Sequence, residues 1–311
     1  MTKSRKPSSS LELVGREQEM LKLSACIQAG RNVLLEGPVG VGKTHLALAI
    51  TGELGRKVFR IDGDSRYSEQ KLSGWFDPPT VIKKGFTAAA FVNGPLVEAM
   101  MCGGVLFINE LNRLPEGVQN VLLPAIDEKM IQVPRLGEVR AKPGFLVIAT
   151  QNPKEFVATS HLSEAILDRF ELVVMDYQSE EDEIEIVLAR VKAITGPFKA
   201  KLAKAAVRLA RLTRHHPRIR RGASVRAAQS ITEIAAVLIG NKNTFEEAFL
   251  TAAVLALPTR IEIEHETDSE KSFQAEVESL LKELTDSVLG DLSNDSQKKN
   301  PRETPTSTAQ V

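Results

Sequence analysis

The eight residues from Gly37 to Thr44 constrain this chain more than any other stretch. They read Gly-Pro-Val-Gly-Val-Gly-Lys-Thr and fit the pattern G-x-x-x-x-G-K-[ST] at every fixed position. Glycines let backbone N–H groups converge on phosphate oxygens without Cβ clashes, and the N-terminus of a helix opening at Lys43 adds positive potential. The apolar run from Val33 to Leu35 precedes the loop. A glycine-rich structural turn is the alternative, but strand, loop, Lys-Thr pair and helix in this order favour a phosphate site.

This motif predicts an ATP site with a magnesium ion. Lys43 reaches the β and γ phosphates as a point charge, and the hydroxyl of Thr44 is a predicted magnesium ligand. The predicted nucleotide-binding residues of the loop are Gly37, Pro38, Val39, Gly40, Val41, Gly42, Lys43 and Thr44.

Short apolar runs alternate with helical patterns through the first half of the chain. Each run is too short and too apolar for a half-exposed antiparallel strand, so we expect strands buried on both faces of a parallel sheet. The clearest helical patterns are Thr44 to Leu54 and Pro115 to Glu128, and the alternation predicts an α/β doubly wound fold. The predicted strands are Val33 to Leu35, Val58 to Ile61, Val105 to Ile108, Phe145 to Ala149 and Leu172 to Met175.

Changes in composition predict five zones. Residues 1–10 are basic and polar and are expected to be a disordered leader, and 11–178 form the α/β domain. In 179–260 the strand signal disappears and a small all-helical lid of about four helices is expected. Residues 261–291 hold a charged connector and an amphipathic helix that stops at Gly290, packing on its own domain or on a partner. Residues 292–311 are expected to be a disordered tail.

Charge and cysteine content narrow the function. Lys plus Arg and Asp plus Glu both number 40, which argues against a constitutive nucleic-acid binder. The two cysteines cannot form a disulfide framework and fit a reducing cytosol, so a cytoplasmic location is expected. No run approaches the roughly 20 apolar residues that a membrane helix needs, so no membrane insertion is expected.

A second motif, Gly103 to Glu110, is a predicted buried strand that ends in polar groups. Active sites of open α/β sheets lie at such carboxyl ends. Glu110 is the candidate base that polarises an attacking water, and Asn109 stands where an Asp normally helps to hold hydrated magnesium. Because Asn109 brings no charge, we expect weaker magnesium retention or slower turnover, with an inactive nucleotide-binding protein as the alternative.

With these motifs in place, the chain resembles the MoxR family of AAA+ ATPases. The resemblance runs from Leu13 to about Ile231 and implies a P-loop AAA+ parallel sheet with flanking helices, followed by the helical lid. The matching segments, in order, are Val14 to Glu17, the loop at Gly37, Phe91 to Leu96, Asn109 to Arg113, Ala149 to Pro153, Leu162 to Phe170 and Gly222 to Arg226.

The resemblance assigns catalytic roles to three further residues. It implies that Asn152 is sensor 1, where an Asx turn before Pro153 is the alternative. Arg169 is implied to be the arginine finger that reaches the γ-phosphate of a neighbouring subunit. A salt bridge to Asp168 or Glu171 is its alternative.

Two further assignments come from the same resemblance. Arg226 is implied to be sensor 2, with a solvated helix face as the alternative. Val14 and Gly15 are implied to line the adenine pocket, although a hydrophobic staple would explain Val14 equally. The segment Tyr67 to Phe91 resembles the helix-2 insertion and is expected to form a loop, and Ile131 to Val139 resembles the hairpin before sensor 1.

The resemblance also implies a ring homo-oligomer, a hexamer, that hydrolyses ATP to remodel or activate a client protein complex. MoxR relatives often work on metalloenzymes with a von Willebrand factor A-domain partner. Two alternatives stay open. One is a nucleic-acid-remodelling NTPase that uses the basic cluster Arg214 to Arg221. The other is a nucleotide-gated scaffold with little hydrolysis, which Asn109 motivates.

Overall fold

The computed structural model describes residues 13–152, 162–191, 198–264 and 272–298. The leader predicted for 1–10 and the last part of the predicted tail, 299–311, lie outside the described residues. The chain divides into two compact units, Met1–Tyr177 and Gln178–Val311.

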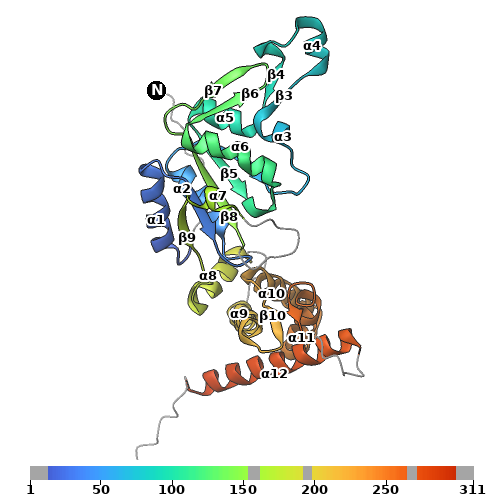
Figure 1. The fold of residues 1–311 in the computed structure, drawn as a ribbon. Coiled ribbons are helices and arrows are strands. Elements are labelled where there is room, and N and C mark those ends of the chain that lie inside the picture. The colour runs from blue at the N-terminus through green and yellow to red at the C-terminus, as the bar shows by residue number, and fades with distance from the viewer. Residues whose placement is uncertain (1–12, 153–161, 192–197, 265–271, 299–311) are drawn as a thin grey trace, which may run out of the picture. The chain divides into compact units, whose positions relative to one another are not determined.

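The first unit is built on a five-stranded sheet in which every neighbouring pair is parallel (Figure 1). The strand order is β2-β5-β8-β1-β9. This confirms the predicted parallel sheet with flanking helices. The strands are β1 (Val33–Glu36), β2 (Val58–Asp62), β5 (Val105–Asn109), β8 (Leu146–Gln151) and β9 (Glu171–Val174).

The central strands are buried on both faces, as their apolar runs predict. Successive side chains of a strand point to opposite faces. On β5, Val105 and Phe107 pack in one cluster with α1 (Glu17–Gln28) and α2 (Lys43–Glu53). Leu106 and Ile108 pack in the other cluster with α5 (Pro95–Cys102) and α6 (Glu116–Asp127).

The edge strands do not follow this prediction. On β9, Val173 is buried, but Leu172 and Val174 are 56% and 59% exposed. An edge strand lies at the margin of the helical layers, so one of its faces is left uncovered. The apolar run of residues 172–175 correctly predicts a strand there, and the prediction of burial on both faces is wrong.

Residues 67–91 fold into a hairpin with a helical tip rather than the predicted loop. The hairpin pairs β3 (Gly74–Phe76) with β4 (Phe91–Asn93) in antiparallel fashion, after α3 (Glu69–Ser73). Between them lie α4 (Pro78–Lys84) and the 3-10 turn η1 (Ala88–Ala90).

The two prolines at the start of α4 favour a helix rather than a loop. The first helical positions need no backbone N–H, so Pro78 and Pro79 fit there. Asp77 caps the helix by accepting a hydrogen bond from the Thr80 N–H at 3.1 Å. A second hairpin, β6 (Met130–Val133) and β7 (Gly137–Arg140), confirms the hairpin predicted at 131–139.

The second unit is mostly helical. It also holds a small antiparallel ribbon of β10 (Ile219–Arg221) and β11 (Glu262–Ile263), which corrects the all-helical prediction. The sequence pattern does not predict this ribbon because its strands have only three and two residues, too few to show a period. The helices are α8 (Glu180–Arg190), α9 (Phe198–His215), α10 (Val225–Gly240), α11 (Phe245–Ala256) and α12 (Phe273–Lys298).

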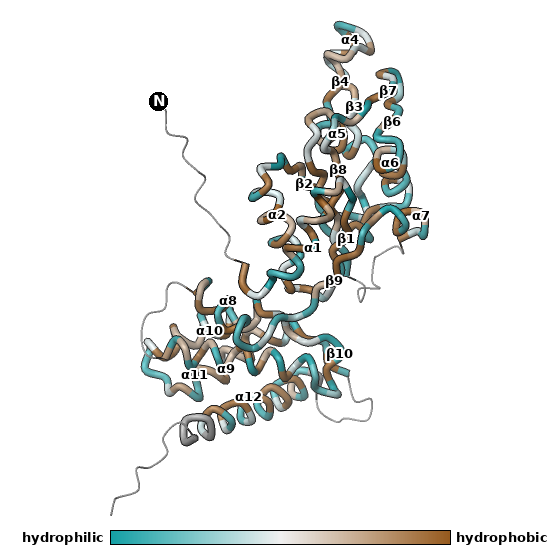
Figure 2. The backbone as a smooth tube through the Cα atoms, turned by 90° about the vertical axis from the view of Figure 1, so that its left-hand side faces the viewer, coloured by the Kyte–Doolittle hydropathy of each residue, from teal (hydrophilic) through white to brown (hydrophobic). Residues whose placement is uncertain are grey.

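The helix α12 packs its apolar stripe into the core of its own unit. Val277, Leu281 and Val288 belong to that core, and hydrophobic and hydrophilic colours alternate along the helix (Figure 2). The predicted stop at Gly290 is wrong. A helical glycine costs only about 1 kcal/mol, and Leu292, 5% exposed, continues the stripe. None of the helices that the structure describes has the length and hydrophobicity needed to span a lipid bilayer.

Candidate nucleotide site

The loop from Gly37 to Gly42 joins the carboxyl end of β1 to the first residue of α2. Gly40 and Gly42 have φ of 84° and 93°, a left-handed conformation that glycine adopts without strain. A Cβ on Gly37 would lie 2.1 Å from the carbonyl oxygen of Met175. The backbone itself therefore requires the glycines of the predicted phosphate loop.

Lys43 lies over this loop. Its Nζ donates to the carbonyl oxygens of Gly37 and Pro38 at 2.6 and 2.9 Å. Lys43 opens α2 next to the helix N-terminus, where backbone N–H groups favour an anion. The ammonium and the helix end thus bring positive charge to one side of the loop.

Arg16 supports the same loop, a role that the sequence does not reveal. Its side chain is 4% exposed and donates to the carbonyl oxygens of Val41 at 2.9 Å and Asp176 at 2.6 Å. It also pairs with Glu19 at 2.6 Å. An arginine at a helix start is usually solvated, so only the tertiary contacts single it out. The neighbouring Val14 and Gly15 are half-buried, and their adenine contact stays a prediction.

The predicted metal residues Thr44 and Asn109 lie in direct contact. Thr44 Oγ1 donates to Asn109 Oδ1 at 3.0 Å, and Thr150 Oγ1 lies 3.2 Å from the same oxygen. Asn109 Nδ2 donates to Asp62 Oδ1 at 2.9 Å. Sequence reasoning missed Asp62 and Thr150, although both stand at the carboxyl ends of predicted strands, where the rule that found Asn109 also applies.

The oxygens of this cluster fit magnesium, which prefers hard oxygen ligands and keeps several waters. Thr44 and Asn109 present such oxygens beside the phosphate loop. Within the described ranges, no group of three or more His, Cys, Asp or Glu side chains is placed to hold a metal ion.

Asp62 is ionised at neutral pH. The hydrogen bond from Arg60 is the main reason that the pKa of Asp62 lies below its ordinary value. Partial burial opposes this shift, and the hydrogen bond from Asn109 adds to it. Arg60 Nη2 lies 2.7 Å from Asp62 Oδ1.

Glu110 has an unusual backbone conformation. Its φ and ψ are 60° and 59°, left-handed values that cost energy for a residue with a Cβ and tend to occur at functional sites. The N–H of Glu110 donates to Thr150 Oγ1 at 2.9 Å, which helps to hold this conformation. The carboxylate pairs with Arg113 at 2.8 Å. No role for Arg113 could be predicted from the local sequence, and its ion pair with Glu110 is visible only in the structure.

Asn152 and Arg169 lie at opposite ends of the sheet. Asn152 follows the carboxyl end of β8 and is 7% exposed. The carbonyl oxygen of Arg169 faces Nδ2 of Asn32, 3.4 Å away, just before the amino end of β1. The Arg169 guanidinium donates to Asp127 at 2.6 Å, so its intramolecular partner is neither Asp168 nor Glu171.

Arg226 belongs to the second unit, where it is the second residue of α10 and is exposed. The helix begins at Val225. The sensor-2 role of Arg226 stays a prediction.

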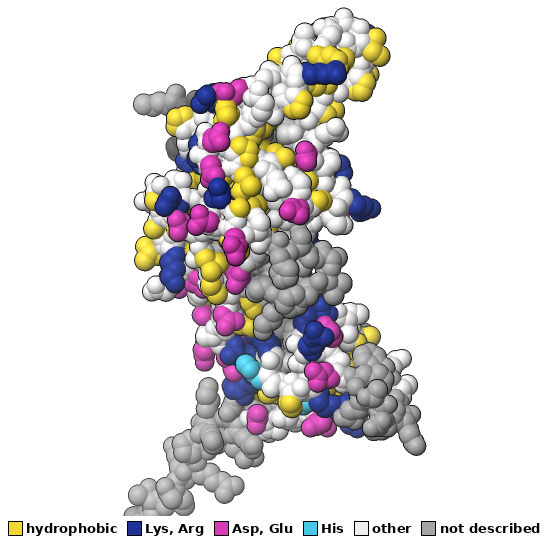
Figure 3. Space-filling model, viewed as in Figure 1, with side chains coloured by type: hydrophobic (Ala, Val, Ile, Leu, Met, Phe, Trp, Pro, Cys, Tyr) yellow, Lys and Arg dark blue, Asp and Glu magenta, His cyan; other side chains and the backbone are white. Residues whose placement is uncertain are grey.

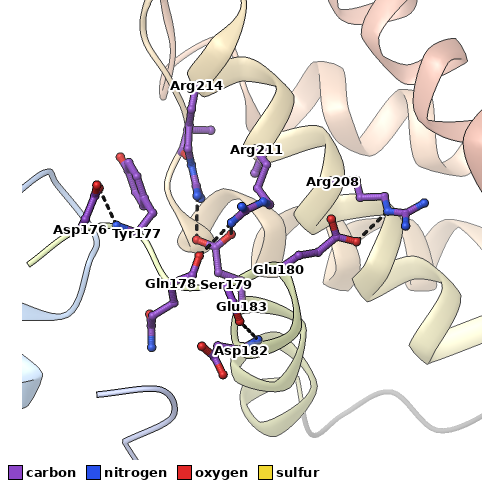
Figure 4. A network of polar contacts seen from close by, with 12 residues as sticks. Asp176, Tyr177, Gln178, Ser179, Glu180, Asp182, Glu183, Arg208, Arg211 and Arg214 are labelled. Carbon is purple, nitrogen blue, oxygen red and sulfur yellow. Dashed lines mark hydrogen bonds and ion pairs between the residues drawn. The ribbon is translucent and has the colours of Figure 1, made fainter. Parts of the chain in front are cut away.

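Three of the four arginines in the basic cluster of residues 214–221 lie near carboxylates. Glu183, 2% exposed, accepts from Arg214 at 2.8 Å and from Arg211 at 3.3 Å, as Figure 4 shows. Arg218 lies 3.9 Å from Glu276, and in the ribbon β10–β11 the Arg220 side chain lies 3.8 Å from Glu262. The Arg214 side chain is only 6% exposed, so it does not form a free cationic surface.

Comparisons with known proteins agree with this geometry. Residues 32–170 match the family described as AAA domain (dynein-related subfamily). The chain is 30% identical over 226 residues to the gas vesicle ATPase GvpN of Haloferax mediterranei, covering 67% of this chain and 64% of that protein. It is 32% identical over 186 residues to the gas vesicle ATPase GvpN1 of Halobacterium salinarum, covering 55% and 54%. The chain thus spans less than two thirds of the length of both relatives.

A solved structure shares the fold. The Holliday junction branch migration motor RuvB of Thermotoga maritima matches with a TM-score of 0.52 and 20% identity, over 80% of this chain and 72% of that one. The glycine loop, the polar carboxyl edge and four of the five strands lie within the stretch that the family match covers, and β9 begins directly after it. Residues 32–170 of this chain therefore resemble an AAA domain in sequence, and the chain shares the fold of the RuvB motor.

Proposed function

We propose that this chain is a magnesium-dependent ATPase of MoxR type that works as a ring homo-oligomer, a hexamer. One observation carries the proposal. Thr44, from the phosphate loop, contacts Asn109 at 3.0 Å, and the candidate base Glu110 is the next residue. The phosphate-binding loop, the proposed magnesium ligands and the candidate base thus lie at the same edge of the sheet.

Each residue of that edge has a chemical role in the proposal. The loop amides and Lys43 bind the phosphates, and Thr44 and Asn109 hold the magnesium ion. A magnesium ion held there with ATP would supply positive charge that offsets the charge developing on the phosphates. Glu110 accepts a proton from the attacking water, a contribution of about 10²–10⁴ in rate, and Asn152 orients that water.

Arg169 is proposed to act on the site of a neighbouring subunit. Its backbone contacts Asn32, before β1, whereas the phosphate loop follows β1 at the other end. A four-residue strand spans about 13 Å at roughly 3.3 Å per residue. This separation supports action in trans, which requires a ring, and an arginine finger adds about 10³ or more in rate. Arg226 and the residues Val14 and Gly15 complete the site in the proposal.

The work of the ring is proposed to be the remodelling of a client protein, with a von Willebrand factor A-domain partner. The hairpin tip supports a protein contact because Trp75, Ile82 and Phe86 are 46%, 86% and 48% exposed. Figure 3 shows hydrophobic side chains gathered over this tip. Both cysteines are free, as a reducing compartment leaves them, so we propose a cytoplasmic location.

A nucleic-acid motor receives less support. In the candidate contact surface, residues 214–221, three of the four arginines lie near Glu183, Glu262 or Glu276. The face shown in Figure 3 also intermixes both signs of charge. DNA-stimulated hydrolysis with a steep salt dependence would restore this alternative.

The test compares phosphate release and nucleotide binding for the assembled wild type, Lys43→Ala and Glu110→Gln. Lys43→Ala should lose nucleotide affinity, while Glu110→Gln should bind ATP with magnesium and turn over about 10²-fold or more slowly. Lys22→Ala, an exposed lysine on α1, is the matched control and should behave as wild type. If the wild type binds ATP but hydrolyses it no faster than Glu110→Gln, the chain is a nucleotide-gated scaffold instead.

A further inference from the structure

The contact between Asn109 and Asp62 has no role in the function proposed above. The two residues end β5 and β2, parallel neighbours whose register pairs them directly. Asn109 Nδ2 donates to Asp62 Oδ1 at 2.9 Å, although the residues are 47 positions apart in the chain.

Only one orientation of the Asn109 amide satisfies all its neighbours. An ionised carboxylate accepts hydrogen bonds and cannot donate them, so the NH₂ group must face Asp62. The oxygen then faces the hydroxyls of Thr44 and Thr150 at 3.0 and 3.2 Å. Asp62 therefore decides that an oxygen, rather than an NH₂ group, is presented beside Thr44.

Asp62 also brings a charge that Asn109 lacks. A carboxylate that hydrogen-bonds to a metal ligand from behind orients the ligand and raises its basicity. Arg60, the other partner of Asp62 Oδ1, stabilises the ionised form. The negative charge thus lies one hydrogen bond away from the oxygen that faces Thr44.

We propose that Asp62 is the positioning residue of the magnesium site: it turns the Asn109 oxygen toward Thr44 and supplies the negative charge that an aspartate at position 109 would carry. This inference rests on the proposed nucleotide site. Asp62 and Asn109 together do what a single Asp does in the ordinary arrangement.

The test measures how much Mg²⁺ tightens the binding of a fluorescent, non-hydrolysable ATP analogue to the full chain. Asp62→Ala removes both the orientation of the Asn109 amide and the negative charge. The gain in nucleotide affinity that Mg²⁺ provides should therefore fall about 10–100-fold. Asp62→Asn keeps a hydrogen-bond acceptor and removes only the charge, so its loss should be smaller. Asp64→Asn is the control. It makes the same charge change two residues away, at a side chain bonded to Arg66, and should match wild type.

A swap provides the second arm. The double variant Asp62→Asn/Asn109→Asp exchanges the hydrogen-bond donor and acceptor and keeps the net charge. It should restore the Mg²⁺-dependent gain in nucleotide affinity to within about twofold of wild type. Asn109→Asp alone puts two carboxylates in contact. Because the residues act as one unit, the fold-changes of the two single variants should not multiply to give that of the double variant.

The outcomes separate this inference from the proposed function. An unchanged Mg²⁺ gain in Asp62→Ala, or single effects that multiply, would overturn the role of Asp62 and leave the nucleotide site standing. A wild type that binds no nucleotide would overturn the proposed function, and binding without any Mg²⁺ gain would overturn the magnesium site. Thermal melting verifies each fold, and Asp62→Asn carries the test if Asp62→Ala does not fold.

Discussion

Arg169 forms an ion pair with Asp127, with 2.6 Å between Nε and Oδ2. Asp127 is the last residue of α6, and the Arg169 side chain is 28% exposed. A carboxylate therefore holds the proposed arginine finger in the single chain. In a ring, the γ-phosphate of the neighbouring subunit would compete with Asp127 for the same guanidinium.

Arg169→Ala should leave nucleotide binding intact and lower turnover by about 10³-fold, because transition-state charge is no longer stabilised. Mixing it with Glu110→Gln should restore part of the activity. The mixed ring contains sites in which an intact Glu110 meets an intact Arg169 from the next subunit. Phosphate release across a range of mixing ratios measures this, and activity that stays at the level of the separate variants would contradict action in trans.

Asp127→Asn is the partner variant. It removes the charge that competes for Arg169 and keeps a polar side chain of similar size. Turnover of the assembled protein should stay equal to wild type or rise. A loss as large as that of Arg169→Ala would mean that Asp127 belongs to the catalytic arrangement and does not only hold the arginine.

Gly37→Ala should weaken nucleotide binding and lower stability. Its Cβ would lie 2.1 Å from the backbone oxygen of Met175, so either the loop or the end of β9 must shift. Gly52→Ala is the contrasting variant, since a Cβ there meets nothing within 4 Å and the residue lies in α2. It should raise the free energy of unfolding by about 0.5–1 kcal/mol. Urea unfolding and nucleotide titration of both variants test the contrast.

Arg16→Ala should loosen the phosphate loop. Two backbone oxygens, of Val41 and Asp176, lose a charged donor. Hydrogen bonds to charged groups contribute about 1.5–3 kcal/mol each, so both stability and nucleotide affinity should fall. Arg16→Lys tests whether the guanidinium geometry matters, because a single ammonium group cannot reproduce the planar set of donors of an arginine. If Arg16→Lys behaves as wild type, the charge alone accounts for the effect.

Glu183→Gln should destabilise the second unit. The Glu183 carboxylate is 2% exposed and faces two arginines, of which Arg214 is 6% exposed. Breaking a buried ion pair leaves an uncompensated buried charge and costs about 3–5 kcal/mol. Glu185→Gln, an exposed position on the same helix, should be nearly neutral. Denaturation followed by far-UV circular dichroism reports on the helices, and equal midpoints for the two variants would contradict the structural role of Glu183.

Local patterns in the sequence were enough to predict the glycine loop, the five parallel strands and, to within one residue, the starts of α2 and α6. These features depend on glycine spacing, apolar runs and caps, which act within a few residues. The predictions were wrong where contacts with residues far apart in the chain determine burial or the end of a helix. The apolar run of β9 says nothing of its place at the sheet edge, and Gly290 cannot stop a helix whose stripe Leu292 continues.

The sequence by itself determined a glycine-rich loop between a strand and a helix of a parallel sheet, and it predicted Thr44, Asn109 and Glu110 as site residues near that loop. Only the tertiary structure decided which partners they receive. Asp62 meets Asn109 because β2 and β5 are neighbours in register, and Asp127 meets Arg169 across 42 residues of chain. Strand order and register are set by the packing of the whole core, so no local pattern records these pairs.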